Sequence, residues 1–185
     1  MFIGREEELK FLEDRYNSAD GQLVVLYGRR RVGKTELLRQ FCQDKEHIFY
    51  TCTEIIDEKQ LEAFSQRLLE KNHQAAKYIT HFSDWEQALL SISELAKEKK
   101  IVVVIDEFPY MVKGNNAIPS ILQKLWDEVL KRSNVMLILC GSAMSFIEKE
   151  VLAEKNPLYG RATGILKMQA MDFYSAQQFF PNYSI

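Results

Sequence analysis

The sequence predicts an α/β fold in which helices cover both faces of a parallel β-sheet. Short apolar runs, typical of buried strands, alternate with amphipathic helical segments along the chain. One early run breaks into the motif Gly-Arg-Arg-Arg-Val-Gly-Lys-Thr at residues 28–35, and a later run ends directly in Asp106-Glu107. The 185 residues suffice for one domain with its own core, so we expect a single domain over residues 1–185.

The motif at residues 28–35 matches the pattern G-x-x-x-x-G-K-[ST] of a phosphate-binding P-loop. Gly28 and Gly33 let the backbone wrap closely around phosphate, with successive N–H groups pointing inward. We expect Lys34 to reach the β- and γ-phosphates and the Thr35 hydroxyl to ligate Mg²⁺. The predicted nucleotide-binding stretch also includes Arg29, Arg30, Arg31, Val32 and Glu36. An ordinary glycine-rich turn is the alternative, and the strand before the motif and the helix after it argue against that.

In the first half of the chain, strands and helices are predicted from the spacing of apolar residues. Strands are expected at residues 23–27 and 47–52. Helices are expected at residues 5–18, 33–45, 57–72 and 84–100. Ser83 is the expected N-cap of the last of these helices, with Glu86 at the capping-box position.

The second half of the chain continues the alternation. Strands are predicted at residues 101–105, 135–139 and 164–168, and the β-branched run 101–105 is typical of a strand covered on both faces. Helices are predicted at residues 118–132, 143–152 and 172–180. Loops are expected around Pro109 with residues 114–116, and at residues 156–161. Trp126 is interpreted as a core residue of its helix.

Composition and charge exclude several classes of protein. The formal net charge of -2 provides no overall attraction to nucleic acid or to an anionic membrane. The three cysteines, Cys42, Cys52 and Cys140, lack metal-ligand spacing and are interpreted as small core residues in a reducing compartment. The apolar runs are too short to span a bilayer, and the N-terminus does not resemble a signal peptide. We therefore expect no membrane partner and a cytoplasmic location.

Two adjacent carboxylates follow the strand predicted at residues 101–105. In an open parallel sheet, ligands bind beyond the carboxyl ends of the strands, where these side chains would emerge beside the P-loop. We expect Asp106 to hold Mg²⁺ and Glu107 to orient and polarise an attacking water. Two acids placed there for solubility are the alternative, but an uncompensated pair would repel. A small-molecule kinase is a further alternative, although the tandem pair suits hydrolysis better.

Ser142 follows the next buried strand and is expected at the same edge of the sheet. There its hydroxyl could contact the γ-phosphate or the attacking water as a sensor, or it could cap the helix that follows. The side chains of Arg29, Arg30 and Arg31 are expected to point outward, toward solvent or a partner. The three histidines form no ligand constellation in the sequence.

These motifs together resemble a known family. Residues 2–9, Phe-Ile-Gly-Arg-Glu-Glu-Glu-Leu, resemble the hhGRExE box of STAND and origin-recognition ATPases of the AAA+ type. The segments 27–35, 105–110, 139–142 and 158–161 look like those of the archaeal-type ATPases within that group. The resemblance covers nearly the whole chain, with its five boxes in the right order.

The resemblance implies a P-loop NTPase core, a three-layer α/β/α sandwich whose five-stranded sheet has the order 5-1-4-3-2. It also implies that Ile3, Gly4 and Arg5 lie near the adenine. Arg161, just before the last strand, would be placed like an arginine finger that acts on a neighbouring subunit. The alternative for Arg161 is a salt bridge that holds the loop at residues 156–163. Relatives continue into a helical lid and often into winged-helix and nuclease-like domains, so we expect this chain to be an ATPase core without the lid.

We therefore expect a core that binds ATP or ADP with Mg²⁺ and hydrolyses ATP at the β–γ bond. Glu107, Lys34, Ser142 and Arg161 are the expected catalytic residues, and Thr35 and Asp106 the metal ligands. The main alternative is a nucleotide-controlled interaction switch, in which turnover is incidental. Two kinds of partner are possible. A second copy of the chain could associate through Arg161, and a protein or DNA could bind through C-terminal domains.

Overall fold

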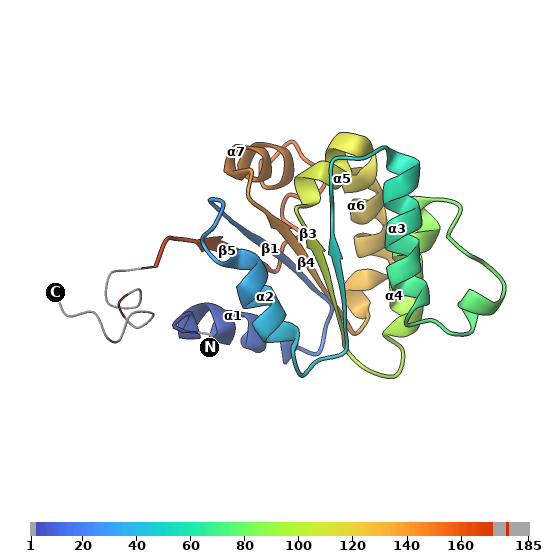
Figure 1. Ribbon diagram of the computed structural model, residues 1–185, viewed down its shortest axis with the longest axis horizontal. Coiled ribbons are helices and arrows are strands. Elements are labelled where there is room, and N and C mark those ends of the chain that lie inside the picture. Colours follow the sequence, from blue (N-terminus) through green and yellow to red (C-terminus); the bar gives the residue numbers. More distant parts are fainter. Residues whose placement is uncertain (1–2, 172–176, 178–185) are drawn as a thin grey trace.

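A computed structural model of the chain, which describes residues 3–171 and residue 177, contains a five-stranded parallel sheet (Figure 1). The strands are β1 (Gln22–Gly28), β2 (His47–Thr51), β3 (Ile101–Asp106), β4 (Val135–Gly141) and β5 (Gly164–Met168). Their order across the sheet is β2-β3-β4-β1-β5, and each neighbouring pair is parallel. Read from the other edge, this is 5-1-4-3-2, so the predicted fold class and strand order are confirmed.

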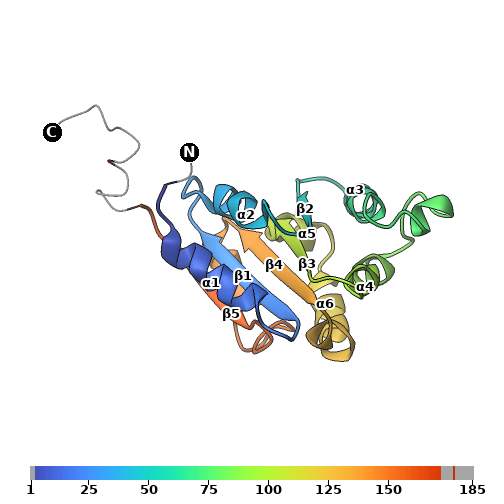
Figure 2. The ribbon, with the colours of Figure 1, turned by 90° about the horizontal axis from the view of Figure 1, so that it is seen from below.

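Helices pack on both faces of the sheet. They are α1 (Glu6–Tyr16), α2 (Lys34–Cys42), α3 (Asp57–Leu69), α4 (Trp85–Leu95), α5 (Phe108–Gly114), α6 (Ile118–Glu128) and the short α7 (Met144–Phe146). Three single turns complete the described part, η1 (Ala75–Lys77), η2 (Leu130–Arg132) and the π-helical η3 (Ile147–Val151). Helix α1 lies beside β1 and β5, and α3 and α4 lie at the β2–β3 end of the sheet (Figure 2).

Alternation of side chains along the strands divides the core between the two faces. Val24 and Leu26 of β1 join the apolar face of α1 and α2, including Leu37 and Phe41. Leu23, Val25 and Tyr27 face the larger cluster that α3, α4, α5 and α6 help to form. Strands β3 and β4 are buried along their whole length, as expected for strands covered on both faces.

Helix α4 does not begin as predicted. Its N-cap is Asp84 and not Ser83, because the Asp84 carboxylate accepts a hydrogen bond of 2.8 Å from the backbone N–H of Gln87. Glu86 forms no capping box and instead pairs with Lys124 on α6, at 2.6 Å. The helix ends at Leu95, so the lysine-rich segment up to residue 100 lies outside it.

The loop predicted around Pro109 and residues 114–116 is wrong over most of its length. Residues Phe108–Gly114 form α5, and Pro109 occupies its first turn, where its missing N–H is not needed. Burial of Phe108 and Met111 against the core favours the helix over the loop. Helix α6 ends at Glu128 and gives way to the turn η2, short of the predicted residue 132. The helix predicted at residues 172–180 falls almost wholly outside the described residues.

Other core assignments agree with the structure. Trp126 is 3% exposed, as predicted for a core residue. Cys42, Cys52 and Cys140 are free and buried, and burial raises the pKa of the Cys42 thiol to about 12. None of the described helices has the length and apolar character needed to cross a bilayer.

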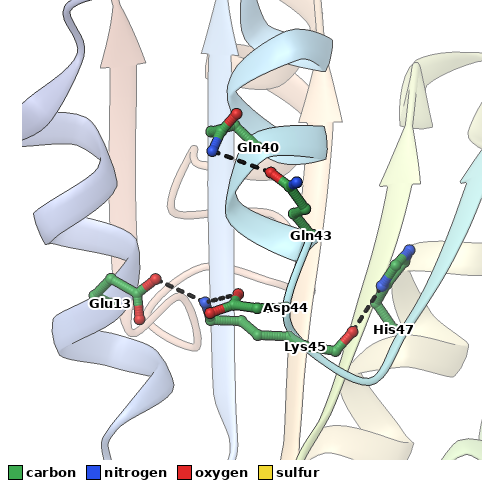
Figure 3. A network of polar contacts seen from close by, with 6 residues as sticks. All are labelled: Glu13, Gln40, Gln43, Asp44, Lys45 and His47. Carbon is green, nitrogen blue, oxygen red and sulfur yellow. Dashed lines mark hydrogen bonds and ion pairs between the residues drawn. The ribbon is translucent and has the colours of Figure 1, made fainter. Parts of the chain in front are cut away.

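The partly buried ammonium group of Lys45 links α1 to the segment that follows α2 (Figure 3). Lys45 Nζ lies 2.7 Å from Glu13 of α1 and 2.8 Å from Asp44. It also lies 4.6 Å from the centre of the Phe41 ring. Burial lowers the pKa of Lys45, but the hydrogen bonds to Asp44 and Glu13 outweigh it, so the net effect raises the pKa. This contact fixes the turn that leads from α2 into β2.

Backbone packing at Gly21 provides a test of the fold. A Cβ there would lie 2.0 Å from the carbonyl oxygen of Leu130, whereas a Cβ at Gly114 would meet nothing closer than 3.8 Å. We expect Gly21→Ala to destabilise the domain by about 1–3 kcal/mol, because a backbone atom must move. Gly114→Ala is the matched control and should change stability by about 0.5–1 kcal/mol at most, in the stabilising direction. Urea unfolding measures both, and equal midpoints for the two variants would contradict this packing.

Candidate functional site

The P-loop connects the end of β1 to the start of α2. Arg31 and Gly33 have left-handed backbone conformations, with φ of 65° and 90°. Such turns orient successive N–H groups toward one point, which is the geometry of an anion-binding nest. Gly28 is also required for packing, because a Cβ there would lie 2.4 Å from the carbonyl oxygen of Met168 on β5. The motif pattern did not reveal this second role.

The three arginines of the loop are exposed, as expected. Arg30 Nη2 donates a hydrogen bond of 3.3 Å to the hydroxyl of Tyr110 on α5. Within the described residues this is the one side-chain hydrogen bond of the three arginines.

Lys34 is a buried cation, with 5% of its surface exposed. Its Nζ donates hydrogen bonds of 2.9 Å to the carbonyl oxygens of Gly28 and Arg29. The ammonium group therefore lies inside the curve of the P-loop, held by the loop's own backbone. Phosphate oxygens are the natural partners of a lysine in this position.

Thr35 and Asp106 meet at the carboxyl edge of the sheet. Thr35 Oγ1 donates a hydrogen bond of 2.9 Å to Asp106 Oδ2, across 71 residues of sequence. Asp106 is 2% exposed, and its other oxygen accepts a hydrogen bond of 3.0 Å from the backbone N–H of Glu107. Burial raises the pKa of the neighbouring Cys140 thiol well above its usual value, and the charge of Asp106 raises it further.

Glu107 and Ser142 form a pair that the sequence did not predict. Ser142 Oγ donates a hydrogen bond of 2.9 Å to Glu107 Oε2, and the Ser142 N–H lies 3.3 Å from the same oxygen. Glu107 has φ of 53°, a left-handed conformation that is uncommon for a residue with a side chain. The alternative in which Ser142 caps the next helix is not observed, because α7 begins at Met144 with Ala143 at the N-cap position.

The N-terminal box lies against the P-loop. Arg5 Nη2 donates hydrogen bonds to the carbonyl oxygens of Val32, at 3.0 Å, and Gln169, at 2.8 Å. Arg5 Nη1 pairs with Glu8 at 2.7 Å. Gly4 and Arg5 both have φ of 70°, and Ile3 is buried. Arg5 thus connects the P-loop to the chain that leaves β5, while contact of Ile3, Gly4 and Arg5 with adenine stays a prediction.

Arg161 lies away from the other site residues. Its guanidinium forms a two-pronged contact with Asp127 of α6, with Nε 3.0 Å from one carboxylate oxygen and Nη2 2.7 Å from the other. Nη1 donates to the carbonyl oxygen of Pro157 at 2.8 Å. The following Thr163 bonds to Leu23 near the start of β1, so Arg161 is at the opposite end of the sheet from the P-loop of its own chain. The salt-bridge alternative is therefore present, and a finger role requires a second subunit.

The donor set at the edge suits a nucleotide with a hard divalent cation. A hydroxyl and a single carboxylate, Thr35 and Asp106, are oxygen ligands of the kind Mg²⁺ prefers when phosphates and waters complete its shell. No cluster of three or more His, Cys, Asp or Glu side chains with metal-binding geometry occurs within residues 3–171. Such a site would use few protein ligands, as is usual for Mg²⁺ bound together with phosphates.

Comparison with known proteins places the chain in a family. A family model described as an ATPase domain predominantly from Archaea matches residues 2–184. The uncharacterized protein MJECL04 of Methanocaldococcus jannaschii is 37% identical over 181 residues, which cover 98% of this chain and 38% of that protein.

Two solved structures share the fold. The Walker-type ATPase PABY2304 of Pyrococcus abyssi superposes with a TM-score of 0.73 at 23% identity, over 97% of this chain and 57% of that one. A chain of the Drosophila ORC bound to DNA superposes with a TM-score of 0.68 at 15% identity, over 96% of this chain and 46% of that one. This chain thus covers between 38% and 57% of the length of these three proteins. With its P-loop and paired carboxylates in place, the chain belongs to the family of ATPase domains found predominantly in Archaea.

Proposed function

We propose that the chain binds ATP with Mg²⁺ and hydrolyses it at the β–γ bond. The observation that carries this proposal is the Thr35–Asp106 hydrogen bond of 2.9 Å, which joins the P-loop to the carboxylates at the end of β3. Family membership and the fold of the structural relatives support an ATP-binding core.

Each residue has a role that follows from its position. Lys34 would exchange its bonds to the loop carbonyls for bonds to the β- and γ-phosphate oxygens. Thr35 would hold Mg²⁺ directly, with Asp106 beside it, and the bound ion would neutralise charge that develops on the phosphates. Glu107 would accept a proton from the attacking water or orient it, and Ser142 would hold the Glu107 carboxylate in one orientation.

A nucleotide-controlled interaction switch is the second candidate function. One contact favours it: the carboxylate of Asp127 already pairs with the guanidinium of Arg161. This pair would have to open before Arg161 could act on the nucleotide of a second subunit, which favours slow turnover until a partner is present. Phosphate release without an added acceptor would exclude the kinase alternative.

The partners belong to the proposal as well. The three similar proteins described above are longer than this chain, and one of them is a chain of an ORC bound to DNA. We propose that a protein or DNA partner binds through segments beyond this domain, and that the protein works in a reducing, cytoplasmic environment that keeps its buried cysteines free.

Nucleotide binding is tested first with Lys34→Ala. ATP with Mg²⁺ at a hundredfold over its Kd should stabilise the parent by about 2.7 kcal/mol, a Tm rise of roughly 5–10 °C. Lys34→Ala should lose most of this rise, because it removes the buried cation. Lys10→Ala, at an exposed position of α1, is the matched control and should keep the full rise. The proposal would be refuted if millimolar ATP and Mg²⁺ left the melting curve of nucleotide-free parent protein unchanged.

Glu107→Gln separates binding from chemistry. The amide can still accept the hydrogen bond from Ser142 but cannot act as a base, so ATP hydrolysis should fall at least about a hundredfold. The Kd for ATP should change little. Phosphate release and calorimetric titration measure the two effects. Hydrolysis at the parent rate would show that Glu107 has another role.

Substitutions at Arg161 and Asp127 test whether Arg161 acts as an arginine finger. If Arg161 only braces its loop, Arg161→Ala and Asp127→Ala should each cost at most about 1 kcal/mol of stability and leave turnover unchanged, because the pair is partly exposed. If Arg161 acts on a neighbouring subunit, Arg161→Ala should lower turnover, while Asp127→Ala should maintain or raise it by freeing the guanidinium.

Mixing experiments distinguish these outcomes in the full-length protein. Inactive Arg161→Ala mixed with inactive Glu107→Gln should regain partial activity when one subunit supplies the guanidinium and the other the intact water site. Specific activity should also rise with protein concentration. No rescue, together with concentration-independent activity, leaves Arg161 with the bracing role alone.

A further inference from the structure

We propose that the free edge of β2 is a docking site for an extended, acidic peptide segment of a partner protein, which adds to the sheet as a sixth strand. Among the described residues, strand β2 is the last strand on its side of the sheet, and it lies between α2 and α3 (Figure 2). The surface is separate from the P-loop and from the residues assigned to ATP binding.

The backbone of β2 offers hydrogen-bonding groups along this edge. The Glu46 carbonyl accepts a bond of 2.9 Å from Val102, and the Cys52 N–H donates one of 2.8 Å to the Asp106 carbonyl. In a parallel ladder, alternate residues bond to a given neighbour, so the residues that face β3 are the even-numbered ones. The N–H and C=O groups of His47, Phe49 and Thr51 therefore face outward.

Strand β2 lacks the sequence features that commonly block strand addition. Natural edge strands commonly carry proline, lysine or a bulge that prevents pairing. The sequence of β2, His-Ile-Phe-Tyr-Thr, has neither proline nor lysine, and its register with β3 runs without a bulge from His47 to Thr51. By contrast, the strand at the other edge, β5, carries Lys167.

A groove lies directly over this edge. It has a volume of about 620 Å³ and is walled by Arg39 and Cys42 of α2 on one side and by residues of α3 on the other. The α3 wall consists of Ala63, Gln66, Arg67 and Glu70. Because the strand forms the floor between two helical walls, a single extended segment can reach it, whereas the sheet edge of a second globular copy is held off. Five residues of added strand would extend over about 17 Å, the length of β2.

The lining specifies the chemistry of the segment. Arg67 is paired with Glu70 at 3.2 Å, while Arg39 is exposed and forms no ion pair within residues 3–171. A carboxylate in the segment would complement Arg39. Phe49, half-buried on the strand, and Ala63 provide apolar contact for an aliphatic or aromatic side chain.

His47 adds a polar group at one end of the groove. Its Nδ1 lies 2.8 Å from the Lys45 carbonyl oxygen, and since a carbonyl can only accept, Nδ1 carries the proton (Figure 3). The other ring nitrogen, Nε2, is then left for the incoming segment. The resulting pattern is a strand with a carboxylate toward α2 and an apolar residue at its centre.

The test uses a phage-displayed library of random eight-residue peptides, selected against the whole chain. We expect enrichment of alternating, β-branched or aromatic sequences that contain Asp or Glu. Phe49→Pro removes an outward N–H and should weaken binding of a synthesised enriched peptide at least about tenfold, without breaking the β2–β3 ladder. Phe49→Val is the matched control, because it loses the same ring but keeps the N–H. Arg39→Glu should also weaken binding of the acidic peptide. The same variant should restore binding of a peptide in which lysine replaces the acidic residue.

Amide hydrogen exchange on the parent chain gives a second readout that does not depend on the folding of the proline variant. Peptide binding should slow exchange at Phe49 and Thr51. The proposal is overturned if no peptide is enriched, if enriched peptides bind Phe49→Pro as well as Phe49→Val, or if protection appears elsewhere. A dimer that Phe49→Pro dissociates, with no peptide enriched, would assign the edge to a second copy of the chain instead.

Discussion

The hydrogen bond between Thr35 and Asp106 forms because the strand order brings these two residues to the same edge of the sheet. Strand β4 lies between β1 and β3, so the residues that follow these three strands meet at one edge of the sheet. Thr35 follows β1 through the P-loop, Asp106 ends β3, and Ser142 follows β4. A hydrogen bond to a charged carboxylate contributes about 1.5–3 kcal/mol, and it also keeps a buried charge partnered. The parallel sheet is thus what makes the chemistry at this edge available.

Close backbone packing explains why the edge has so little freedom. Gly28 has no space for a side chain because β5 passes directly beside it, so the P-loop begins from a fixed point. Glu107 has a left-handed backbone, which costs about 1–3 kcal/mol for a residue with a side chain. The bonds from the Glu107 N–H to Asp106, and from Ser142 to its carboxylate, offset that cost and hold the carboxylate in place. The strain is located at the residue for which we propose the hydrolytic role, as is common at functional sites.

The carboxyl edge and the lateral edge of the sheet present different chemical groups to a ligand. The carboxyl edge concentrates charge and backbone donors at the P-loop, where nucleotide chemistry is proposed. The lateral edge at β2 presents backbone groups between two helices, where strand addition is proposed. Helix α2 contributes to both, since it begins at Lys34 and carries Arg39 into the groove wall. A partner on β2 and a nucleotide at the P-loop would therefore contact the same helix.

The sequence by itself determined the fold class, the P-loop and the strand that presents Asp106 and Glu107. These depend on local spacing: apolar runs of strand length, a glycine–lysine motif, and acids directly after a buried run. Local spacing did not determine where some of the helices begin and end. The N-cap of α4 is Asp84 and not Ser83. Residues 108–114 form α5 and not the expected loop, because burial of Phe108 and Met111 against the core outweighed the turn signal. Only the tertiary structure decided that Ser142 bonds to Glu107, that Arg161 pairs with Asp127 and that Arg5 reaches Val32, since each contact joins residues far apart in the sequence.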